Sequence, residues 1–300
     1  MTADTLRLPG RTLLFTPGRP LVMGIVNANP DSFSDAVRHT SLEAQAEYAL
    51  ALVADGADLI DVGGESGVTY TGVTGEDVEI ERVVPLVERL VAEGVLVSVD
   101  TWKPAVARAA VAAGAAIIND VSGLRDPGLA DVAAATGAGL VVMHTRAAPK
   151  EVGFPDYGGD VVGDVVAFLR ERCAVARERG VAAEQLLLDP GPDFAKRPGE
   201  SVDVLRALPR LRAELGRPVL AAVSRKYFLG AITGRPPSDR LAGTLAAVAQ
   251  AVAAGAAIVR VHDVAAVVDF LATQRVLTGI EEVGTFDEDD DGLKWIRAAG

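Results

Sequence analysis

Chemically competent side chains stand at the end of nearly every strongly apolar run in this chain. The run 97–99 ends in Asp100, the run 186–188 ends in Asp189, and the run 117–118 ends in Asn119. The full series of end residues is Asn27, Asp61, Asp100, Asn119, His144, Asp189, Ser224 with Arg225 and Lys226, and His262. In a parallel barrel such ends form one rim, where barrel enzymes do their chemistry.

Four of these side chains favour a flat, polar heterocycle as ligand. Asp100, Asn119, Asp189 and Lys226 offer carboxylates, an amide and an ammonium. Such groups match the adjacent N–H donors and carbonyl of an amino-pyrimidinone edge. Arg260 has a planar guanidinium that can stack on such a ring. One buried Asp or Asn can instead satisfy a loop backbone, but eight together favour a site.

A second group is directed at anions. Positive or protonatable side chains come from the seventh and eighth strands, whose ends are the usual phosphate-binding corner of a barrel. They are Arg225, Lys226, Arg260 and His262. Asn27, with Asp61 nearby, offers oxygen ligands for Mg²⁺. The other interpretation of this group is a surface network of ion pairs.

Eight strand–helix units predict the frame that positions these residues. Expected strands are 21–26, 58–63, 95–99, 115–118, 139–143, 186–188, 218–223 and 257–261. Helices are expected near 41–55, 76–93, 104–113, 128–136, 161–179, 200–215, 239–254 and 264–277. Continuous apolar strands are typical of sheets covered on both faces. Eight such units favour an α/β fold of the (β/α)8 TIM-barrel type over a doubly wound sheet.

Segments outside the barrel are short. Two strand-like pieces flank Pro9-Gly10, which predicts an N-terminal β-hairpin over 1–20. The barrel would occupy 21–280, and a short acidic C-terminal tail would occupy 281–300. The run 287–291 in this tail is entirely acidic, which is typical of a solvated segment.

Composition narrows the class of protein. The net charge of −12 argues against nucleic acid or an anionic membrane as a partner. Cys173 is the one cysteine, so no disulfide within the chain is expected and a cytoplasmic location is the simplest interpretation. The longest apolar stretch, 241–259, is interrupted by Gly and polar residues and predicts a buried helix and strand, not a membrane span.

Short motifs at these strand ends resemble those of the dihydropteroate synthase family. The first is Met-Gly-Ile-Val-Asn-Ala-Asn-Pro-Asp-Ser-Phe-Ser-Asp over 23–35, and the second is Asp-Val-Gly-Gly-Glu-Ser over 61–66. Further matches follow in family order at 99–101, 118–123, 142–144, 188–191, 224–226 and 260–264. The resemblance covers about 21–277.

The resemblance implies a transferase of folate biosynthesis. Members join a pterin methyl diphosphate to p-aminobenzoate and release diphosphate. By resemblance, the pterin would be held by Asp100, Asn119, Asp189 and Lys226, with Met143 packed against its ring. Asn27, Arg260 and His262 would hold the diphosphate, with Mg²⁺ bound at Asn27, and Phe194 would face the amine. A first loop carrying Asp31 and Asp35 would close over the site. Family members are commonly homodimers.

Departures from the family pattern cluster around the second substrate. Gly67-Val68 stands where Thr-Arg is usual, and Tyr227 stands where Ser is usual. The usual Gly-Phe-Gly-Phe-Gly-Lys reads Gly-Pro-Asp-Phe-Ala-Lys over 191–196. An alternative is therefore a paralogue that binds the pterin but uses another amine or nucleophile, or lacks synthase activity. A corrinoid-type methyltransferase barrel is disfavoured, because that class needs neither Lys226 nor the first-loop motif.

Overall fold

The computed structural model describes residues 4–28, 41–65 and 72–283. Within them, eight parallel strands form a barrel in the order β8-β7-β6-β5-β4-β3-β10-β9. Their bounds are β3 Leu21–Asn27, β4 Leu59–Gly63, β5 Val97–Asp100, β6 Ile117–Asp120, β7 Gly139–Met143, β8 Leu186–Asp189, β9 Leu220–Ala221 and β10 Ile258–Val261. A parallel bridge between Leu188 and Val219 closes the ring. The predicted (β/α)8 barrel is confirmed.

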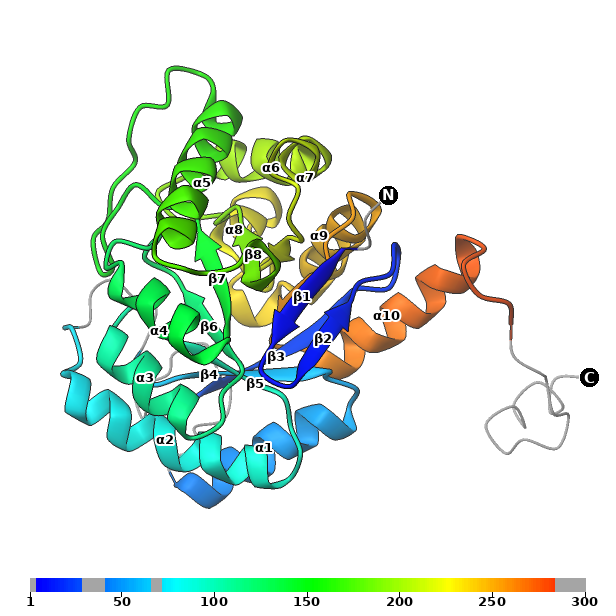
Figure 1. The fold of residues 1–300 in the computed structure, drawn as a ribbon. Helices are drawn as coiled ribbons and strands as arrows, with labels where there is room; N and C mark the ends of the chain where they lie inside the picture. The colour runs from blue at the N-terminus through cyan, green and yellow to red at the C-terminus, as the bar shows by residue number, and fades with distance from the viewer. Residues whose placement is uncertain (1–3, 29–40, 66–71, 284–300) are drawn as a thin grey trace, which may run out of the picture.

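Helices lie around the outside of this ring (Figure 1). They are α1 Leu42–Ala54, α2 Glu76–Ala92, α3 Pro104–Ala112, α4 Gly128–Thr136, α5 Val161–Glu178, α6 Pro198–Arg206, α7 Leu208–Leu215, α8 Tyr227–Thr233, α9 Leu241–Ala253 and α10 Val264–Leu277. The expected single helix over 200–215 is wrong. It is divided at Ala207, because Pro209 cannot donate the backbone hydrogen bond that a continuous helix needs. Helix α8 was not expected from the sequence.

The N-terminal hairpin closes one end of the barrel. Its strands are β1 Thr5–Leu8 and β2 Arg11–Leu14, paired antiparallel, and Figure 1 shows them lying across the ring. Leu6, Leu8 and Phe15 belong to one buried cluster with inward-facing residues of the barrel strands. The predicted hairpin is therefore present, and it plugs the end opposite the carboxyl ends of the strands.

Side-chain alternation along each strand separates the two faces of the sheet. On β3, Met23 lies in the inner cluster, whereas Val22 and Val26 belong to the outer core beneath the helices. Because the period is two, residues farther along on the inner face are Ile25 and Asn27. On most strands the inner face is therefore apolar at the plugged end and polar at the open end, whereas β7 places the apolar Met143 at the open end.

Strand register places the polar inner residues in one row. Asn27 pairs with Gly63, Gly63 pairs with Asp100, and Asp100 pairs with Asn119. A Cβ built on Gly63 would lie 3.6 Å from Cβ of Asp100 and 4.0 Å from Oδ1 of Asn27, so this glycine leaves room between the two side chains.

In the described part of the chain, no helix has both the length and the apolar character needed to cross a membrane.

Candidate active site

A cavity of about 400 Å³ opens at the carboxyl ends of the strands. Nine of the predicted site residues line it: Asn27, Asp100, Asn119, Met143, Asp189, Phe194, Lys226, Arg260 and His262. They come from β3, β5, β6, β7, β8 and β10 and from the segments after β8, β9 and β10. Asp31 and Asp35 lie outside the described residues. Six of these nine belong to the strand-end series, namely Asn27, Asp100, Asn119, Asp189, Lys226 and His262, and the structure brings them to one cavity.

Arg260 organises the floor of the cavity. Its Nε donates to Oδ2 of Asp61 at 2.6 Å, and its Nη2 donates to Oδ2 of Asp100 at 2.8 Å. Nδ2 of Asn119 donates to the same Asp61 oxygen at 2.9 Å. Asp61 is fully buried. One cation therefore spans the barrel from β10 to β4 and β5, and fixes the carboxylate and amide that face the cavity.

Burial shifts the pKa of the acidic groups upward. It raises the pKa of Asp100 to about 7, although the charge of Arg260 opposes this shift. It also raises the pKa of Asp189, against a hydrogen bond from the Gly191 amide and the charge of Lys226. These carboxyls are therefore held in a setting that favours ligands bearing N–H donors or positive charge.

The cation of Lys226 lies over an aromatic wall. Its Nζ is 4.4 Å from the centre of the Phe194 ring. Burial lowers the pKa of Lys226, whereas the carboxylates of Asp193 and Asp189 act to raise it. Nδ1 of His262 lies 2.9 Å from Oγ of Ser224, at the same corner of the barrel. This side of the cavity thus combines a cation, a histidine and an aromatic face.

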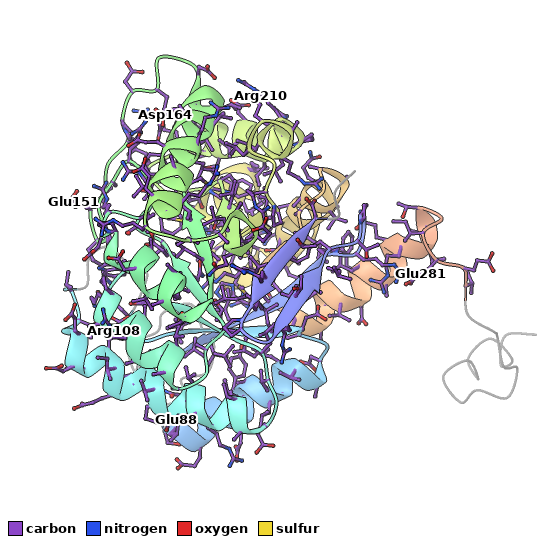
Figure 2. The ribbon with its side chains drawn as sticks, viewed as in Figure 1. Glu88, Arg108, Glu151, Asp164, Arg210 and Glu281 are labelled. Carbon is purple, nitrogen blue, oxygen red and sulfur yellow. The ribbon has the colours of Figure 1, made fainter. Side chains whose placement is uncertain are left out.

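Two of the candidate strand-end residues have structural positions instead. His144 is completely buried, with Nε2 2.8 Å from Asp164 and Nδ1 2.7 Å from Nζ of Lys196. Figure 2 labels Asp164 on α5, outside the ring of strands. Arg225 forms a two-pronged ion pair with Asp263 at 2.6 and 3.1 Å. Neither His144 nor Arg225 lines the cavity.

Other cavity residues were not singled out from the sequence. Trp102, Lys150, Asp193 and the segment 151–154 line the outer part of the cavity, as does Glu65 of the second motif. Glu65 accepts from Lys103 at 2.5 Å, and Lys103 is also 2.5 Å from Glu79 of α2. Because these partners are far apart in sequence, no local pattern indicates that they meet.

The oxygen donors for a metal are few. Among the described residues, no group of three or more His, Cys, Asp or Glu side chains is arranged to hold a metal ion. Asn27 lines the cavity. Because Gly63 has no side chain, there is space beside Oδ1 of Asn27. This setting fits a Mg²⁺ ion that takes one protein ligand and completes its shell with phosphate oxygens and water.

Comparison with known proteins agrees with this geometry. Residues 23–262 match a family model described as pterin binding enzyme. Dihydropteroate synthase of Bacillus subtilis is 43% identical over 248 residues, which cover 82% of this chain and 84% of that protein.

Solved structures are also similar. Dihydropteroate synthase of Xanthomonas albilineans with 4-aminobenzoic acid has a TM-score of 0.85 and 46% identity, covering 93% of this chain and all of that one. The Burkholderia cenocepacia enzyme complexed with 7,8-dihydropteroate has a TM-score of 0.83 and 43% identity, covering 93% of this chain and 98% of the other.

Proposed function

We propose, because this chain belongs to the dihydropteroate synthase family of pterin-binding enzymes, that it joins 6-hydroxymethyl-7,8-dihydropterin diphosphate to p-aminobenzoate. The products are 7,8-dihydropteroate and diphosphate, and the reaction belongs to folate biosynthesis. The observation that carries the proposal is the hydrogen-bonded network of Asp61, Arg260, Asp100 and Asn119 at the cavity floor, with Asp189 lining the same cavity. It presents acceptors and an amide to a flat ring that has N–H groups along one edge.

Pterin recognition follows from the order of groups along the inner face. Asp189 and Asn119 face the amino-pyrimidinone edge, and Met143 packs against the ring. Lys226 supplies a cation at the same ring. Each contact also excludes water, so the hydrogen bonds act in a setting of low polarity.

Bond breaking depends on stabilising two separated charges. The C–O bond between the pterin methylene and the diphosphate breaks, and its electron pair leaves with the diphosphate. Arg260 and His262, at the phosphate corner, stabilise the leaving group, and the Asp100 carboxylate stabilises the methylene cation. The amine nitrogen then attacks this carbon and loses a proton to water or to the released diphosphate. The first loop, which carries Asp31 and Asp35, would close over the site and exclude water from the cation.

Mg²⁺ is the proposed cofactor, and Asn27 would hold it. When bound, the ion would neutralise charge on the leaving group. The amine rests against Phe194, the aromatic wall beside Lys226. A homodimer in the cytoplasm is the expected setting, on the family resemblance and the single cysteine.

The test is product formation. Purified protein is incubated with the pterin diphosphate, Mg²⁺ and p-aminobenzoate. The products are then separated and identified by mass spectrometry. A dihydropteroate peak is expected. If calorimetry shows that the pterin diphosphate binds but no dihydropteroate forms, the result would instead favour the paralogue that uses another nucleophile. Other amines would then be screened.

A further inference from the structure

Asp193 places a fixed carboxylate in the wall of the cavity, next to Phe194. Its side chain accepts hydrogen bonds from the first two amides of α8, at Tyr227 and at Phe228, the latter at 3.2 Å. Ser201 donates to its Oδ1 at 3.3 Å and accepts from its backbone amide at 2.9 Å. The carboxylate is therefore held from two helices and cannot swing away from the wall.

The backbone at this position favours a residue without a side chain. Asp193 has a φ of +68°, in the left-handed region. The family pattern has Gly here, which adopts this conformation without steric cost. Asp is one of the few other residues that tolerate it. The loop thus keeps a conformation suited to glycine while adding a negative charge.

The charge lies beside the cation of the amine wall. Burial lowers the pKa of Lys226, and several neighbouring carboxylates raise it. Asp193 makes the largest of these opposing contributions. Two further carboxylates line the outer cavity, Glu65 and Glu151, and Glu65 is already balanced by Lys103 at 2.5 Å and Lys150 at 3.4 Å. A carboxylate brought by an amine on Phe194 would therefore compete with Asp193 for Lys226 and be repelled by Asp193 itself.

We propose that Asp193 determines the specificity for the second substrate, by lowering the affinity of the cavity for aromatic amines that carry a carboxylate. The inference rests on the proposed function and sharpens it. Such a residue makes p-aminobenzoate a weaker substrate, relative to its neutral analogue, than it would be with an uncharged residue at position 193.

The experiment compares p-aminobenzoate with p-aminobenzamide, which has the same shape without the charge. KM for each amine is measured in the unmodified protein and in Asp193→Asn. Asn tolerates the left-handed backbone and keeps one acceptor for the α8 amides. KM for p-aminobenzoate is expected to fall about fivefold, while that for p-aminobenzamide stays constant, as expected for one charge in a partly exposed setting.

Asp203→Asn is the matched control, since it removes the same charge from the outer surface of α6. A second variant, Asp193→Gly, restores the residue usual in the family and is expected to shift the KM ratio in the same direction. An unchanged ratio in both variants at position 193, or an equal change in Asp203→Asn, would overturn the inference.

Failure of the proposed function is recognised separately. If neither amine gives product although the pterin diphosphate binds, the condensation is disproved. The same ratio is then obtained from equilibrium dissociation constants of the two amines on the protein with pterin diphosphate, by calorimetry. A roughly fivefold change in that ratio on Asp193→Asn supports the role of Asp193, and no change overturns it.

Discussion

Lys196 places its Nζ 2.7 Å from Nδ1 of His144, beneath the loop that carries Phe194. The same Nζ donates to the carbonyl oxygens of Gly191 at 2.9 Å and Phe194 at 3.1 Å. Burial, together with the charge of Lys196, lowers the pKa of His144 to about 3, so the imidazole is neutral. It accepts from Lys196 at Nδ1 and donates from Nε2 to Asp164. One buried chain of hydrogen bonds thus holds the amine wall.

Replacing Lys196 with Met should destabilise the protein strongly. The two loop carbonyls and Nδ1 of His144 would lose their donor in a buried setting, at a cost of about 3 kcal/mol. The free energy of unfolding is measured by urea denaturation. The control is Arg210→Met, which removes an exposed cation of α7 and should leave the midpoint unchanged. Equal midpoints for the two variants would contradict the structural role of Lys196.

Replacing Ala195 with Gly should stabilise the protein. Ala195 has a φ of +53°, a conformation that costs an L residue with a Cβ roughly 1 kcal/mol more than it costs Gly. The expected gain corresponds to a rise in Tm of about 2 °C, measured by calorimetry. The matched control is Ala174→Gly, at an exposed position inside α5. The same chemical change there should lower stability by about 0.5–1 kcal/mol. A loss of stability in both variants would show that Ala195 is not strained.

The sequence predicts the inner part of this site because strand geometry leaves little choice. Asn27, Asp100, Asn119 and Asp189 end apolar runs, and parallel strands in one barrel must present such ends at the same rim. The period of two then decides which of them point inward. The local pattern and the barrel topology together therefore suffice to predict that these residues lie at the inner rim.

The outer part depends on tertiary contacts that leave no local pattern. Asp193 and Ala195 adopt left-handed backbone conformations that cannot be predicted from their residue types. Lys103 finds its partners Glu65 and Glu79 on other elements, through contacts that form only once the barrel is closed. Helix α8 is also too short for its periodicity to be recognised.

Replacing Lys226 with Ala should abolish measurable pterin binding. The cation lies at the cavity wall with Asp189 and Asp193 as its main negative neighbours, so its loss removes a donor to the pterin and leaves the buried Asp189 without its nearest opposing charge. Calorimetric titration with the pterin diphosphate should show at least a hundredfold loss of affinity, about 3 kcal/mol. Arg210→Ala serves as the control for loss of an exposed cation. An unchanged dissociation constant in Lys226→Ala would disprove the assignment of the pterin pocket.

The raised pKa of Asp100 predicts opposite effects of pH on binding and on folding. Its carboxyl titrates near 7 in the folded protein and at an ordinary value of 3.8 when unfolded. The folded state therefore holds the extra proton between these values, and the stability contributed by Asp100 falls as pH rises toward 7. Pterin binding uses the ionised carboxylate, so affinity should instead increase as pH rises toward 7.

Titrations of the pterin diphosphate at about pH 6, 7 and 8 should show this trend, with a limiting slope of tenfold per pH unit below the pKa. Asp100→Asn cannot ionise, and its dissociation constant should vary less with pH than that of the unmodified protein. The difference in unfolding free energy between the two proteins should vary with pH in the opposite direction. A pH-independent affinity in the unmodified protein, or the same slope in Asp100→Asn, would show that the ionised Asp100 does not contact the pterin.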